Sequence, residues 1–170
     1  MSVSLAAMLV FFPAGMAYAA ASDLLTMTIS NRLCLALFAG FLACAAYVGL
    51  TPEQWGLHFA AGALVLVVCF GMFAAGWIGG GDAKLAAVTA LWFGFEHLMP
   101  YLAIAGVFGG FLTLAILKLR SAPLPAFALG WQWLQRLHSP DEGVPYGIAL
   151  AFSALLVLPE TSLWRAAILG

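Results

Sequence analysis

Charged residues are scarce in this chain of 170 residues. Asp, Glu, Lys and Arg together account for 8% of it, whereas soluble globular domains carry about 25%. Hydrophobic residues make up 65%, and the mean hydropathy is +1.06. These values exclude a water-soluble single-core domain and a disordered tail, and the net charge of −1 excludes broad electrostatic binding of nucleic acid. What remains is a protein that crosses a membrane, in which each charge is costly and needs a reason.

Paired cysteines are also lacking. The three cysteines, Cys34, Cys44 and Cys69, lie singly within apolar stretches, and none forms a C-x-x-C motif. This pattern excludes a disulfide scaffold and gives no support to a zinc site. We expect the thiols to act as small buried hydrophobic groups, and we expect neither a metal nor another cofactor.

The apolar residues gather into six segments that are long enough to cross a bilayer or nearly so. We predict an all-α, polytopic transmembrane helix bundle of about six spans, folded as a single domain over residues 1–170. No positive charge precedes the first segment, so we interpret it as a retained span and not as a cleaved signal peptide. Glu96, His97 and Pro100 predict a tight turn between the fourth and fifth segments. The predicted spans are 3–21, 33–50, 56–78, 83–98, 100–117 and 144–160.

The few basic residues predict the orientation. With six spans, the connections after the first, third and fifth lie on one side of the membrane and carry five of the six Lys and Arg residues, against only Arg165 on the other. The positive-inside rule then places these connections in the cytoplasm and both termini outside. The aromatic stretch within 118–143 is expected to lie along the lipid headgroups. The five residues are Arg32, Lys84, Lys118, Arg120 and Arg136.

Two acidic residues stand out by their placement. Asp23 follows the first predicted span and Asp82 follows the third, so one complete hairpin separates them and both must lie on the same face. Two adjacent carboxylates cannot both ionise cheaply, and such a pair shares a proton. The ionised member can then take a proton from water while the protonated member polarises a carbonyl. The alternative for Asp82 is a helix N-cap, and for Asp23 an ordinary acid at the membrane interface.

Residues near the two acids are candidates for supporting roles. Gly79, Gly80 and Gly81 directly precede Asp82, and glycine permits positive φ and the close approach of another backbone. Lys84 could favour an ionised carboxylate or bind a substrate carbonyl, or it could only extend toward the headgroups. Asn31 could orient the Asp23 carboxylate or cap a helix.

Three motifs together resemble the type IV prepilin peptidases. Gly79-Gly80-Gly81-Asp82-Ala83-Lys84 matches the G-x-G-D-x-K signature of that family. Asp23 precedes Thr28-Ile29-Ser30-Asn31 as that family's first catalytic aspartate precedes an I-P-N or I-P-D turn, and Val144-Pro145-Tyr146-Gly147-Ile148-Ala149 resembles its entry to the last span. The chain's small size and the residues of the last two motifs are most similar to the CpaA/TadV-like branch, which serves Flp-type pili in tight-adherence systems.

The resemblance implies a GxGD membrane aspartic protease of the bacterial inner membrane, with Asp23 and Asp82 catalytic at the cytoplasmic face. It implies a prepilin substrate, cut between its leader and its hydrophobic helix, and makes the pilus assembly machinery a possible partner. Two departures matter. Ser30 stands where proline is usual, and the insertion with paired C-x-x-C motifs found in larger members is missing, so methyltransferase activity is not expected.

Other functions and other acids remain as alternatives. A presenilin-like intramembrane protease would use the same chemistry on other substrates, and a small transporter or assembly scaffold would use the acids as a proton or cation site. Asp141 and Glu142 lie on the same predicted face as the pair, although Ser139-Pro140-Asp141-Glu142-Gly143 has the composition of a polar turn.

Overall fold

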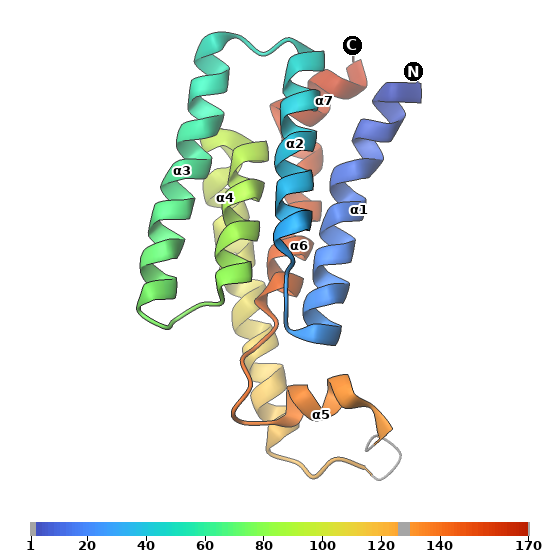
Figure 1. Ribbon diagram of the computed structural model, residues 1–170, viewed down its shortest axis with the longest axis vertical. Coiled ribbons are helices and arrows are strands. Elements are labelled where there is room, and N and C mark those ends of the chain that lie inside the picture. Colours follow the sequence, from blue (N-terminus) through green and yellow to red (C-terminus); the bar gives the residue numbers. More distant parts are fainter. Residues whose placement is uncertain (1–2, 126–129, 170) are drawn as a thin grey trace.

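Every regular element in the described part of the chain, residues 3–125 and 130–169 of a computed structural model, is a helix (Figure 1). Three of these helices, α2, α3 and α4, are long and apolar enough to cross a membrane. The predicted all-α membrane helix bundle is therefore confirmed. The elements are α1 (Val3–Thr26), α2 (Asn31–Val48), α3 (Pro52–Ala74), α4 (Gly80–Arg120), α5 (Gln132–His138), α6 (Tyr146–Val157), the 3₁₀ turn η2 (Leu158–Glu160) and α7 (Ser162–Leu169).

Helix α4 consists of two arms that meet at Gly94. The chain runs toward the end of the bundle that holds both termini, reverses there, and descends past its own starting point (Figure 1). Gly94 has φ 62° and ψ −175°, a conformation that is essentially restricted to glycine. The rings of Phe93 and Tyr101, with centroids 5.3 Å apart, connect the two arms. Two antiparallel segments were predicted here, but the turn lies at Gly94 and not at Glu96–Pro100.

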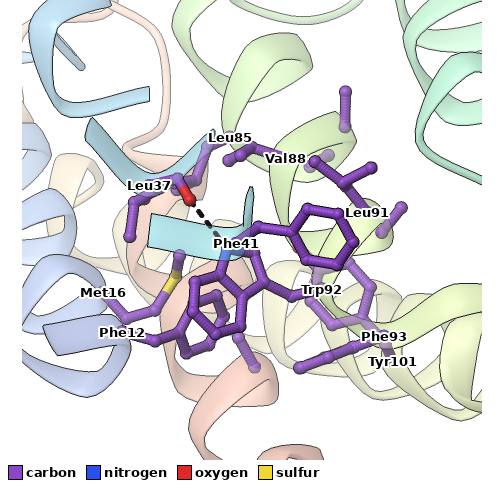
Figure 2. Packing of buried hydrophobic residues seen from close by; sticks show 14 of the residues in the cluster. Phe12, Met16, Leu37, Phe41, Leu85, Val88, Leu91, Trp92, Phe93 and Tyr101 are labelled. Carbon is purple, nitrogen blue, oxygen red and sulfur yellow. Dashed lines mark hydrogen bonds between the residues drawn. The ribbon is translucent and has the colours of Figure 1, made fainter. Parts of the chain in front are cut away.

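The first arm of α4 is the centre of the bundle. Its residues are buried on all sides from Leu85 to Gly94, as expected for a helix that is apolar around its whole circumference. Trp92 donates its indole N–H to the carbonyl oxygen of Leu37 at 3.0 Å and packs against Phe12 and Phe41, with ring centroids 4.7 and 6.0 Å away (Figure 2). These contacts tie the first arm of α4 to α1 and α2 near its break at Gly94.

The connections alternate between the two ends of the bundle. The links from α1 to α2, from α3 to α4 and from α4 to α5 lie at one end, whereas both termini and the α2–α3 link lie at the other (Figure 1). Helix starts within these links carry local caps. Ser30 accepts a hydrogen bond from the Leu33 N–H at 3.2 Å, and Thr51 and Gln54 form a reciprocal capping box.

Several predicted boundaries were wrong. Helix α1 continues to Thr26, so Asp23 lies within its last turns and not after it. The last predicted span, 144–160, consists of the 12-residue helix α6 and a 3₁₀ turn, and α7 follows it. Within the predicted interfacial stretch of 118–143, the structure forms the short helix α5, and residues 126–129 lie outside the described residues.

Candidate active site

Asp23 is held by the start of a distant helix. Its side chain is buried, with 5% of its surface exposed, and its Oδ2 accepts a hydrogen bond from the Gly147 N–H at 2.7 Å. Gly147 lies in the first turn of α6, where backbone N–H groups lack helical partners and attract an anion. A residue 124 positions away along the chain therefore fixes the Asp23 carboxylate.

Asp82 lies in the first turn of α4, three residues after the N-cap residue Gly79. A Cβ atom on Gly79 would stand 2.9 Å from Asp82 Oδ2, so the carboxylate folds back over the glycine backbone. Its other oxygen, Oδ1, is buried and has no hydrogen-bond partner among the described residues. A carboxyl oxygen in that state is available to a proton or to a water molecule.

The two acids converge on Gly147. The Gly147 N–H donates its hydrogen bond to Asp23, and Asp82 lies near enough to interact electrostatically with the Asp23 carboxylate and with the Gly147 backbone. The link between α1 and α2 closes the same site, because Ile29 packs between Gly147 and Gly81. The structure thus brings together the two residues predicted to be catalytic, which had been inferred only to share a face.

The glycines of the site allow neighbouring segments to approach closely, and none of them is needed for a positive φ. A Cβ on Gly81 would lie 3.1 Å from Ile29 Cβ, and one on Gly147 would lie 2.7 Å from Asp23 Oδ2. Gly79, as the N-cap of α4, has an ordinary φ of −72°, whereas positive φ occurs at Gly76 in the preceding turn. Larger side chains at Gly81 or Gly147 would push apart the segments that carry the acids.

Asn31 and Lys84 contact each other. Lys84 Nζ donates to Asn31 Oδ1 at 2.6 Å, and both side chains are exposed. Asn31 is the first residue of α2, and its cap is Ser30, so the proposed capping role of Asn31 falls to its neighbour. The Asn31 side chain binds Lys84 instead of orienting Asp23. Both residues lie next to the segments that carry the acids, but their own contact is with each other.

The alternative acids lie elsewhere. Asp141 and Glu142 are exposed in the connection between α5 and α6, which Arg120 holds by donating to the carbonyl oxygens of Leu137, Glu142 and Gly143. Over residues 3–125 and 130–169, no cluster of three or more His, Cys, Asp or Glu side chains is placed to bind a metal ion.

Gly147 is the residue of the site that sequence reasoning did not single out. The Val144–Ala149 motif contains Gly147, but the motif by itself assigns this glycine no role. Its position could have identified it: Gly147 directly follows Pro145 and Tyr146 at a predicted helix start, and N–H groups in the first turn of a helix are free to bind an anion.

The arrangement is suited to acid–base chemistry. Two carboxyl groups lie close together in a largely buried place, each beside the N-terminal turn of a helix, and one carboxyl oxygen is unpaired within the described residues. Such a pair can hold one proton between two oxygens and exchange it with water and with a bound carbonyl. The geometry thus allows hydrolysis of a polar bond without a covalent intermediate on the protein.

Comparison with known protein families gives a match. The model of the "Type IV leader peptidase family" matches residues 10–114, which is more than half of the chain and includes both acids. The matched part ends before α5, α6 and Gly147. Neither the curated proteins nor the solved structures gave a match.

Proposed function

The chain belongs to the type IV leader peptidase family, and we propose that it is a membrane-embedded aspartic endopeptidase that removes the leader peptide of prepilins. The observation that supports the aspartic mechanism is the approach of Asp82 to the Asp23 carboxylate, which the Gly147 N–H holds in place. A peptidase of this kind needs one carboxylate to activate water and one carboxylic acid to polarise the scissile carbonyl.

The proposed reaction divides the two roles between the acids. The Gly147 N–H fixes the Asp23 carboxylate in place, and in the proposed reaction Asp23 is the base that takes a proton from the attacking water. Asp82, whose Oδ1 is unpaired, carries the proton and donates it to the carbonyl oxygen as the tetrahedral intermediate forms. Collapse of the intermediate then breaks the C–N bond: the leaving amine takes the proton that Asp23 received, and one hydroxyl of the intermediate returns its proton to Asp82 as the new carboxyl group forms.

Substrate class and location are further parts of the proposal. The leader-bearing prepilins of Flp-type pili fit the small CpaA/TadV-like pattern of the three motifs, and a prepilin would enter from the bilayer with its hydrophobic helix. The pilus assembly machinery is then a partner. Five of the six basic residues support a cytoplasmic position for the site at the inner membrane, with both termini outside.

Substitution of the two acids tests the mechanism. We expect Asp23→Asn and Asp82→Asn each to abolish leader removal from a co-expressed prepilin, because an amide can neither activate water nor donate the acid proton. Membrane insertion and protein level should survive, since Asn is isosteric with Asp. Immunoblotting of the pilin and N-terminal sequencing of the product provide the measurement.

Asp141→Asn is the matched control, because this acid is exposed in the α5–α6 connection. The Asp141→Asn variant should remove the prepilin leader as the wild-type protein does. Normal processing by either Asp23→Asn or Asp82→Asn would overturn the aspartic mechanism. A cut inside the hydrophobic helix would instead favour the presenilin-like alternative, and a wild-type protein that never cleaves would favour the transporter or scaffold.

A further inference from the structure

A groove of about 580 Å³ runs between α2, α3 and the first arm of α4. These three helices lie next to one another in the bundle (Figure 1). The groove walls are apolar and include side chains that face outward from the bundle, among them Leu35, Phe38, Phe59 and Leu66. A groove with such walls is open to the hydrocarbon phase of the membrane.

The shape of the groove follows from small residues in its floor. Helix α3 approaches α4 so closely at Gly62 that a Cβ there would lie 3.1 Å from Leu91 Cβ and 3.3 Å from the Ala87 carbonyl oxygen. Ala63 and Ala87, which also line the groove, fill little of it. The groove therefore results from the small residues at the contact between α3 and α4.

One end of the groove is polar and carries a positive charge. Lys84 and Asn31 line it there, joined by the 2.6 Å hydrogen bond between Nζ and Oδ1. An ammonium group has three donors, and this bond uses one of them. Within the described residues the ion pairs are His97–Glu96 and Arg165–Glu160, so no carboxylate neutralises Lys84 there.

The groove lies on a different side of α4 from the acids. Asp82 and Lys84 are two residues apart, which separates their side chains by about 200° around a helix. Asp82 faces Gly147 of α6, whereas Lys84 faces Asn31 of α2. A ligand seated in the groove therefore leaves the acid pair free, and it is distinct from the peptide that the pair would cut.

The dimensions favour a lipid chain over a helix. A helix about 10–12 Å across occupies roughly 500 Å³ per turn, so the groove could enclose about one turn. A single acyl chain is thinner than a helix and can lie between the apolar walls, which a small anion alone would leave unused. The combination of an apolar groove and an uncompensated cation at its end matches a lipid with a negatively charged headgroup.

We propose that this groove binds an anionic phospholipid, with the headgroup phosphate at Lys84 and Asn31 and an acyl chain along α2, α3 and α4. The bound lipid covers the exposed side chains of the groove and neutralises Lys84. Binding requires no cleavage, so the proposal stands or falls independently of the peptidase activity.

Native mass spectrometry of the delipidated full-length chain tests the proposal. Phosphatidylglycerol and phosphatidylcholine with the same acyl chains are titrated separately, and bound lipids are counted. We expect one tightly held phosphatidylglycerol, and Lys84→Gln should weaken it by about fivefold, the effect of one basic residue at an anionic headgroup. Lys118→Gln, which alters an exposed lysine near the far end of α4, should have no effect.

A second pair of variants tests the groove without altering charge. Ala63→Phe should fill it and displace the lipid, whereas Val67→Phe, on the exposed face of α3 outside the groove lining, should not. Equal binding of the two lipids, or equal losses from Lys84→Gln and Lys118→Gln, would overturn the proposal. Displacement of the lipid by an added apolar helical peptide with one acidic residue, itself dependent on Lys84, would show that a helix is the occupant instead.

Discussion

At the scale of single residues, the site depends on glycines, which have no Cβ atom. Gly147 donates its N–H to Asp23, and the absence of a Cβ on Gly147 leaves room for the Asp23 carboxylate. The absence of a Cβ on Gly81 likewise lets the segment with Ile29 pack against the segment with Asp82. A carboxylate that is fixed by one short hydrogen bond in a buried place is sensitive to small displacements. A shift of about 1 Å in a reacting group can cost about 100-fold in rate.

We therefore predict that Gly147→Ala lowers the rate of leader cleavage by about 100-fold, since its Cβ would overlap Asp23 Oδ2 and move the carboxylate. Initial rates on a purified prepilin, at saturating substrate, provide the measurement. Gly143→Ala is the control, because a Cβ there meets nothing within 4 Å, and it should keep the wild-type rate. A fully active Gly147→Ala protein would show that the Gly147 contact does not position the acid.

At the scale of elements, the break in α4 decides where the acids lie. The reversal at Gly94 lets the first arm stand at the centre of the bundle, with Gly81 near its start against Ile29 of the α1–α2 link, while the second arm returns along α6. His58 supports the turn: its imidazole Nδ1 lies 2.7 Å from the Leu91 carbonyl oxygen, and its ring fills the space next to Gly94.

Gly94→Ala should destabilise the protein by about 1–3 kcal/mol, because an L-residue is strained at φ 62° and ψ −175°. The added Cβ would also lie 3.2 Å from the His58 ring. Thermal unfolding in detergent, followed by circular dichroism, measures the change. Gly106→Ala, within the second arm and with open space around it, should be neutral or stabilising by up to about 1 kcal/mol. Equal behaviour of the two variants would contradict the role assigned to Gly94.

At the scale of the whole molecule, the alternating connections make the bundle asymmetric. The end that carries the links after α1, α3 and α4 also holds the acid pair and most of the basic residues, and both termini lie at the opposite end (Figure 1). Charge asymmetry of this kind sets the orientation of a membrane protein.

We predict that a cysteine introduced at Ser121 is protected from a membrane-impermeant thiol reagent in intact spheroplasts, whereas one at Thr51 is labelled. Both positions are exposed in the structure and lie in connections at opposite ends of the bundle. A variant lacking Cys34, Cys44 and Cys69 provides the background, and permeabilised membranes provide the control in which both positions react. The reverse pattern would place the acid pair outside the cytoplasm.

The amino-acid sequence by itself determined the class of the molecule and the candidates for its chemistry. Hydropathy is a local property, so long apolar runs predicted helices that the structure confirmed, and counting them placed Asp23 and Asp82 on one face. Helix limits were less predictable, because the last turns of α1 and the break at Gly94 depend on packing against neighbouring helices.

Only the tertiary structure decided which residues meet. Asp23 and Gly147 are 124 positions apart, and their hydrogen bond exists because α6 packs between α1 and the second arm of α4. The pairing of Lys84 with Asn31, and not with either acid, follows from the direction in which each side chain leaves its helix. Such contacts arise from the relative rotation and offset of whole helices, which no local pattern of residues encodes.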